Sequence, residues 1–301
     1  MIEKKNRLGY TERQLSIILS FCKNMEKHPR IAYSKFHREY SNYSRKQSTI
    51  YILNKAYEQN IIVGPYIYCN RRLKVELQKD DRNPFELLEE AKKDKRVTYA
   101  LALGGEWSFL TLKMIDDNSK NVLNHVSTIV PDYGAKDRIE DLYFEKEGKL
   151  EEDLSPQGWD ELDWEVYRQL GAPREVTIRE VADRLNFSWK YIKERFDRIM
   201  RQCKCLCYYL PLGYSGYHYI FLTFKTEYEI GLRKSLAKLD RSSYLQRFND
   251  TIMLTLFLDP EPHSYSVAID KFKELKEAGL VHELRISIPH NWQKPNFDFP
   301  L

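Results

Sequence analysis

The 301-residue sequence lacks the features that mark several large classes of protein. It has no apolar run long enough to cross a bilayer, and its polar amino terminus has no apolar stretch behind it as a signal peptide would. We therefore expect a cytoplasmic protein without membrane contact. The phosphate-binding motifs Gly-x-x-x-x-Gly-Lys-Ser/Thr and Gly-x-Gly-x-x-Gly are also missing, so no nucleotide site is predicted.

Cysteine is scarce, and none of the five residues is spaced as Cys-x-x-Cys. Cys203, Cys205 and Cys207 alternate, so a strand would place their side chains on one face. Both a metal or redox site and simple packing of thiols fit this pattern. Packing is favoured because no pair of histidines lies nearby, so we expect no metal and no cofactor.

Excess charge is small as well, with 48 Lys and Arg against 44 Asp and Glu and a net charge of +4. Any binding of nucleic acid must therefore come from local patches. The segment Ser188–Cys203 is such a patch, since it contains neither Pro nor Gly and Ser188 can cap a helix. Its apolar residues recur at steps of four, three and four: Ile192, Phe196, Ile199 and Cys203. The cations lie off that stripe: Lys190, Lys193, Arg195, Arg198 and Arg201.

A second, shorter helix is predicted directly before this segment, at Thr177–Leu185. Asn186 and Phe187 separate the two, which is typical of a helix-turn-helix. A solvated helix face without a partner is the alternative interpretation of the basic segment.

The chain also contains an internal repeat with an offset of 144 residues. Its matches are few: Asn42-Tyr43-Ser44 with Asn186-Phe187-Ser188, Leu110-Thr111-Leu112 with Leu254-Thr255-Leu256, and Leu88 with Leu232. The order of predicted elements repeats too. We therefore predict an α+β chain built from two tandem copies of a winged helix-turn-helix followed by a ferredoxin-like βαββαβ domain. The predicted units are 1–70, 71–147, a linker at 148–158, 159–214, 215–290 and a tail at 291–301.

Some elements of this prediction depend on weak patterns. Ser119–Ile129 is predicted as a helix and Arg138–Lys146 as the fourth strand of the first ferredoxin-like domain. Each wing is predicted as a hairpin, the first from Ile61–Val63 with Tyr66–Asn70. The second wing combines Leu206–Leu210 with the turn at 213–216.

The pattern resembles the leucine-responsive/asparagine-type (Lrp/AsnC) family of regulators. The residues that carry the resemblance are Leu162-Asp163-Trp164-Glu165-Val166, Ser188–Cys203, Tyr217–Lys225 and Thr251–Asp259. It implies a transcription regulator that binds double-stranded DNA, is not an enzyme and responds to a small-molecule effector. The chain departs from the family by carrying two copies, a less basic first helix-turn-helix, and Gly104-Gly105-Glu106 where the second copy has Asp250. Since sheets of this family pair into dimers, the two copies would form a pseudo-dimer within one chain, with a homodimer left open.

DNA contacts are expected at the start of each recognition helix, where side chains reach base edges and phosphates. In the first copy the candidates are Arg45, Lys46, Gln47 and Tyr51. In the second copy they are Ser188, Trp189, Lys190, Lys193 and Glu194 in the groove, with Arg195, Arg198 and Arg201 at phosphate or solvent.

Two other functions remain open. The architecture is also similar to that of siroheme decarboxylases, whose tetrapyrrole site would need His and Arg residues in one pocket. The histidines available in the second copy are scattered along the sequence: His218, His263, His282 and His290. The second alternative is a tandem winged-helix module that binds protein.

Overall fold

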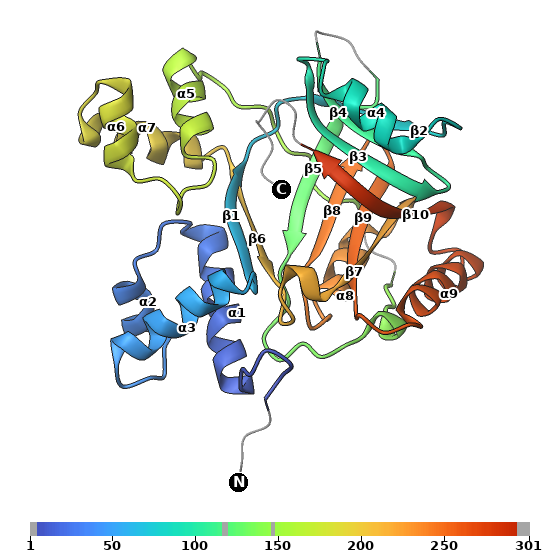
Figure 1. Ribbon diagram of the computed structural model, residues 1–301, viewed down its shortest axis with the longest axis horizontal. Coiled ribbons are helices and arrows are strands. Elements are labelled where there is room, and N and C mark those ends of the chain that lie inside the picture. Colours follow the sequence, from blue (N-terminus) through green and yellow to red (C-terminus); the bar gives the residue numbers. More distant parts are fainter. Residues whose placement is uncertain (1–4, 116–119, 146–147, 294–301) are drawn as a thin grey trace.

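The computed structural model describes residues 5–115, 120–145 and 148–293. Two groups of three helices lie beside a two-stranded ribbon, and a large curled sheet with outer helices lies on the ribbon's other side (Figure 1). The helices are α1 (Glu12–Lys27), α2 (Tyr33–Tyr40), α3 (Lys46–Glu58), α4 (Pro84–Ala91), α5 (Glu161–Gln169), α6 (Ile178–Leu185), α7 (Trp189–Met200), α8 (Glu229–Leu236) and α9 (Ser264–Glu277), with single 3-10 turns η1 (Ile139–Asp141) and η2 (Tyr214–Gly216).

The strands pair antiparallel throughout, so the predicted α+β class is confirmed. They are β1 (Ile62–Tyr68), β2 (Leu73–Gln78), β3 (Val97–Gly105), β4 (Phe109–Met114), β5 (Leu123–Ile129), β6 (Lys204–Tyr209), β7 (His218–Lys225), β8 (Ser243–Phe248), β9 (Thr251–Leu258) and β10 (His282–Gln293). No helix in the described ranges is both long and apolar enough to span a membrane.

The predicted helix-turn-helix of the second half is present as α6 and α7. The Ser188 hydroxyl accepts a hydrogen bond from the amide of Tyr191 at 3.3 Å, which makes Ser188 the N-cap of α7. Asn186 ends α6 with a left-handed backbone at φ 59°, a conformation that Asn tolerates well. The apolar stripe is buried at Ile192, Phe196 and Ile199, because it packs on α5 and α6.

The two predicted hairpin wings are wrong. β1 continues through Gly64, which has a φ of 93°, and pairs on both sides of this residue with β6 from the other half of the chain. Tyr66 lies opposite Leu206 in that register, and Tyr68 lies opposite Lys204. A single strand needs a partner for its backbone N–H and C=O groups, and each half supplies the partner for the other. This β1–β6 ribbon therefore joins the two halves.

The large sheet also mixes strands from both halves, in the order β2-β4-β3-β10-β7-β9-β8-β5. The second half contributes a continuous block, β10-β7-β9-β8, whereas β5 from the first half lies beyond it against β8. The amide of Val75 in β2 donates to the carbonyl of Asn121 at 2.8 Å, just before β5. The two ends of the sheet therefore meet, and its inner face encloses a volume beneath the ribbon.

Two predictions in the first half are wrong. The described part of Ser119–Ile129 contains the strand β5 instead of a helix, because β8 offers backbone partners along its whole length. The described part of Arg138–Lys146 contains η1 and irregular backbone instead of a strand. Leu142 and Phe144 nevertheless lie in the core, so the alternating apolar pattern reflects burial without strand pairing.

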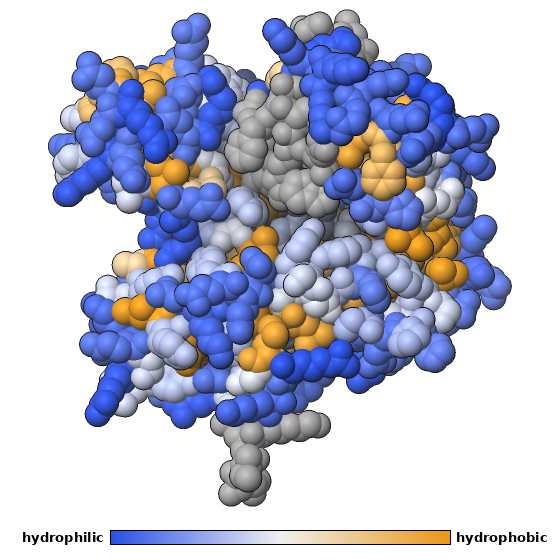
Figure 2. All heavy atoms as spheres, viewed as in Figure 1, coloured by the Kyte–Doolittle hydropathy of each residue, from blue (hydrophilic) through white to orange (hydrophobic). Residues whose placement is uncertain are grey.

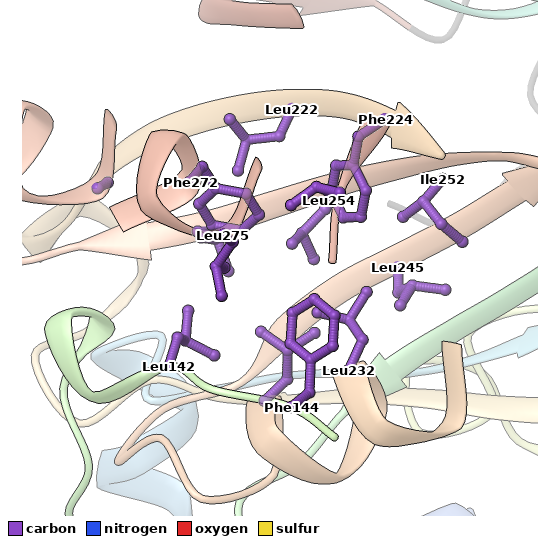
Figure 3. Packing of buried hydrophobic residues seen from close by; sticks show 14 of the residues in the cluster. Leu142, Phe144, Leu222, Phe224, Leu232, Leu245, Ile252, Leu254, Phe272 and Leu275 are labelled. Carbon is purple, nitrogen blue, oxygen red and sulfur yellow. The ribbon is translucent and has the colours of Figure 1, made fainter. Parts of the chain in front are cut away.

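The sheet has a separate hydrophobic core on each face. Leu142 and Phe144 pack against Leu254 and Phe272 in the outer core, under α8 and α9 (Figure 3). The inner core lies between the sheet and the ribbon and is rich in tyrosine, including Tyr208 and Tyr244. Hydrophilic side chains cover most of the visible molecular face (Figure 2). Both halves contribute side chains to the inner core and to the outer core.

Candidate functional site

A cavity of about 270 Å³ lies within the inner core, between the ribbon and the sheet. Val63, Tyr66 and Tyr208 reach it from the ribbon, while the other residues come from the sheet and nearby loops. Small-molecule sites are typically apolar cavities with a few convergent polar groups. The lining residues are Asn60, Val63, Tyr66, Tyr99, Leu101, Leu110, Tyr208, Tyr214, Tyr219, Phe221, Tyr244, Gln246, Thr255 and Phe257. We call this space the tyrosine cavity.

Six of the lining residues are tyrosines, drawn from both halves of the chain. Burial raises the pKa of each of the six hydroxyls above its ordinary value. The hydroxyls therefore stay neutral and protonated at physiological pH. Phe257 stabilises the aromatic wall, with its ring 5.4 Å from that of Tyr219 and nearly perpendicular to it.

Two polar groups of β8 are buried against this cavity without a hydrogen bond of normal geometry. They are the hydroxyl of Tyr244 and the amide nitrogen of Gln246, on residues only 4% and 5% exposed. Burial raises the pKa of Tyr244, and the nearby Gln246 side chain offsets a smaller part of that shift. Burying an unsatisfied polar group costs about 1–3 kcal/mol. The pair is therefore suited to a ligand that brings an oxygen acceptor.

A second hollow of about 650 Å³ adjoins the tyrosine cavity and shares Asn60, Val63 and Tyr66 with it. Arg174 lies in this outer hollow, where its guanidinium donates to the carbonyl of Ile31 at 3.0 Å and lies 4.9 Å from the centre of the Tyr33 ring. Glu58 and Glu175 also line the hollow. Its rim is therefore charged but not uniformly positive.

A separate polar cleft of about 910 Å³ lies where residues 149–157 cross β5 and β6. His125 lines it, with Nδ1 at 2.8 Å from the carbonyl oxygen of Glu151 and Nε2 at 3.2 Å from the Ser127 hydroxyl. Leu150 is buried, and the Asp153 carboxylate accepts from the amide of Val126 at 2.8 Å. Much of the predicted linker is therefore fixed to the sheet.

His125 is expected to make folding pH-dependent. Burial and then the charge of Lys204 lower the pKa of His125 to about 4, below its ordinary value of 6.5. Since the unfolded state binds this proton more readily, the contribution is complete above pH 6.5 and is lost as the pH falls through about 4. The loss is roughly 3 kcal/mol. Urea unfolding between pH 7 and pH 4 should show it, and His125→Gln should have a shallower pH dependence; equal slopes would contradict this role.

The residues predicted to contact DNA lie away from these cavities, with the exception of Arg201, which lines the polar cleft. The side chains of Arg195 and Arg198 form ion pairs within the same helical unit. Arg195 pairs with Asp160 at 2.5 Å, and Arg198 pairs with the buried Asp163, so both hold α7 to the start of α5. Lys193 pairs with Asp197. The remaining candidates are exposed on the two helical units: Arg45, Lys46, Gln47, Tyr51, Ser188, Trp189, Lys190 and Glu194.

Sequence reasoning missed the tyrosine cavity. Its tyrosines are spread from Tyr66 to Tyr244, and the only hint was the total of 21 tyrosines. The histidines considered for a tetrapyrrole site do not line the cavities named above: His218, His263, His282 and His290. Within the described ranges, no group of three or more His, Cys, Asp or Glu side chains could hold a metal ion.

Comparison with known proteins defines the fold. No protein-family model matches the sequence, and no curated protein sequence matches it significantly. A crystal structure of the siroheme decarboxylase NirDL matches with a TM-score of 0.50 and 11% identity, covering 95% of this chain and 94% of that chain. The same enzyme in co-complex with an iron-uroporphyrin III analogue matches with a TM-score of 0.47 and 10% identity, covering 93% of this chain and 92% of that one. The first match indicates a shared fold.

This comparison corrects the predicted identity. The matched structure, which spans nearly the whole chain, is that of an enzyme, and the comparison offers no support for a transcription regulator. The predictions of an Lrp/AsnC-type regulator and of a chain that is not an enzyme are therefore wrong. The resemblance rested on the order of elements, and a decarboxylase shares the fold.

Proposed function

We propose that this chain is an enzyme that binds a tetrapyrrole and removes carboxyl groups from it. The observation that carries the proposal is the pair Tyr244 and Gln246, whose buried polar groups face a cavity without normal hydrogen bonds. A substrate carboxylate would accept hydrogen bonds from both groups. The shared fold with a siroheme decarboxylase supports a carboxylated tetrapyrrole as the substrate class.

The volumes of the tyrosine cavity and of the outer hollow suit a substrate that places only one part of itself in the tyrosine cavity. The tyrosine cavity, at about 270 Å³, is too small for a complete tetrapyrrole but can take one ring edge with its carboxylated side chain. The rest of the substrate would occupy the adjoining outer hollow of about 650 Å³. There the Arg174 guanidinium offers a charge-assisted hydrogen bond to a further carboxylate.

The cavity also provides conditions that favour loss of CO₂. Decarboxylation breaks the bond between the carboxyl carbon and the substrate carbon that carries it, and CO₂ leaves. The electron pair stays on the substrate carbon, which then takes up a proton. An apolar environment raises the free energy of a carboxylate more than that of neutral CO₂. The buried tyrosine hydroxyls keep their protons, since burial raises their pKa, so they can hold the carboxylate and donate a proton.

We also infer that the two halves are copies of one unit, a helix-turn-helix group with a wing strand followed by a ferredoxin-like domain. In support, α1 to α3 lead into β1, just as α5 to α7 lead into β6. The block β10-β7-β9-β8 has the strand order of a ferredoxin-like sheet, and β2-β4-β3 repeats three of its four positions. Its fourth strand, β5, pairs with β8 along its length and meets the first strand, β2, at the bridge between Lys74 and Val122.

Titration of the purified protein with siroheme tests the proposal. We expect a saturable change in the siroheme absorption spectrum and, after incubation, products lighter by the mass of CO₂. A double variant with Lys190→Glu and Lys193→Glu should bind equally well, because both lysines are exposed outside the cavity. A spectrum that does not change with protein concentration, together with an unaltered substrate mass, would refute the proposal.

A further inference from the structure

All five cysteines of the chain lie along the β1–β6 ribbon or on the helix beside it. Cys69 follows β1, Cys203 precedes β6, and Cys205 and Cys207 lie within β6. They form two pairs of neighbouring thiols, Cys203 beside Cys69 and Cys207 beside Cys22. All five are reduced.

The first pair has the arrangement of a cross-strand disulfide. Tyr68 lies opposite Lys204 in the antiparallel ribbon, so Cys69 and Cys203 are the next facing residues. Facing residues in antiparallel strands have Cα atoms about 4.5–5.5 Å apart. Disulfides need a Cα separation of about 4.4–6.8 Å. A bond between these sulfurs therefore requires rotation of side chains but no rearrangement of the ribbon.

The two thiol pairs differ in their access to solvent. Cys69 and Cys203 both line the polar cleft of about 910 Å³, and Cys203 is partly exposed. Cys22 and Cys207 are completely buried at 0% exposure, between α1 and the ribbon. A small oxidant dissolved in water can therefore reach the first pair and not the second.

We propose that Cys69 and Cys203 form an oxidation site at which a peroxide closes a disulfide between the two halves of the chain. One sulfur attacks a peroxide oxygen, which breaks the O–O bond, gives a sulfenic acid and releases water in the case of hydrogen peroxide. The second sulfur displaces the sulfenic hydroxyl as another water. Two thiols and one hydrogen peroxide thus yield one disulfide and two waters, with the peroxide reduced by two electrons.

The reaction should be slow at neutral pH and faster in alkali. The hydrogen bond to Cys69, followed by burial, raises the pKa of the Cys203 thiol, and the thiolate is the reactive form. The closed bond would cross-link residues that are far apart in the sequence, so it would hold the ends of β1 and β6 together even in the unfolded chain.

Exposure of the full chain to hydrogen peroxide at pH 7 and pH 9 tests this site. We expect the intact mass to fall by two hydrogen atoms, faster at pH 9, and peptide mapping without reductant to link Cys69 with Cys203. Cys203→Ser should abolish the change, whereas Cys22→Ser, which removes one member of the buried pair, should keep it. A link between Cys22 and Cys207, or full alkylation of Cys69 and Cys203 after oxidation, would overturn the proposal. No tetrapyrrole is present, so the outcome is independent of the proposed decarboxylation.

Discussion

Replacing Glu229 by alanine is expected to lower the free energy of unfolding by about 3–5 kcal/mol, because the change removes the buried counter-charge of Arg247 and leaves only the exposed carboxylate of Glu152, at 3.8 Å. Glu229 is 0% exposed, and its carboxylate accepts from the guanidinium of Arg247 at 2.5 Å and from the amide of Leu150 at 2.9 Å. Arg247 is 3% exposed and also donates to the carbonyl of Leu150 at 2.9 Å. The pair joins α8, β8 and the segment after residue 148.

Urea unfolding monitored by circular dichroism measures this loss, and Glu227→Ala is a matched control two residues away. The Glu227 side chain is 72% exposed and pairs with Lys149 at 3.5 Å, so its removal should change stability by less than about 1 kcal/mol. Similar losses in both variants would show that burial of the Glu229 pair is unimportant. The Glu229→Ala change should also free the segment around Leu150 from α8, and limited proteolysis would detect this.

Replacing Gln246 by leucine is expected to weaken tetrapyrrole binding while leaving the fold intact. Loss of a hydrogen bond to a charged group costs about 1.5–3 kcal/mol, equivalent to a decrease in affinity of roughly 10- to 100-fold. The Gln246 amide nitrogen is buried without a normal hydrogen bond, so an apolar side chain of similar size should keep or slightly raise stability, by up to about 1 kcal/mol. Tyr244→Phe should behave in the same way.

Absorption titrations with siroheme and urea unfolding of the same samples separate the two effects. Gln169→Leu is the control, because Gln169 lies on α5 outside the tyrosine cavity and should leave affinity unchanged. Unchanged affinity in the Gln246 and Tyr244 variants would place the substrate elsewhere, even if the chain binds siroheme. A large loss of stability would instead show that the two side chains support the fold.

Local patterns were sufficient for the helices next to the ribbon. The cap at Ser188 and the apolar spacing through Ile199 predict α7 because a helix satisfies its backbone within itself. Strands depend on partners that are distant in the sequence, and the predictions that proved wrong concern strand pairing: the two hairpin wings and the segments 119–129 and 138–146. The segment that becomes β5 forms its hydrogen bonds with β8, which lies more than a hundred residues later in the chain. The residues next to β5 in the sequence do not indicate which strand it pairs with.

The ribbon shows the same limit for the candidate site. The alternation of Cys203, Cys205 and Cys207 identifies a strand, but the residue opposite Cys203 follows from the pairing of β1 with β6. The tyrosine cavity likewise requires the ribbon to lie over the inner face of the sheet, which brings Tyr66 near Tyr244. No regular spacing in the sequence relates residues that are so far apart, so their contact could not be predicted from it.

The sequence alone determined the α+β class and the two helices α6 and α7 of the second half, since these follow from local periodicity and capping. Only the tertiary structure decided that the halves share one sheet, that β1 and β6 pair, and that the polar groups of Tyr244 and Gln246 are buried against one cavity without a hydrogen bond of normal geometry. The physical reason is that a strand leaves its backbone groups to be satisfied by another strand. The choice of that strand sets which side chains meet in the cavity.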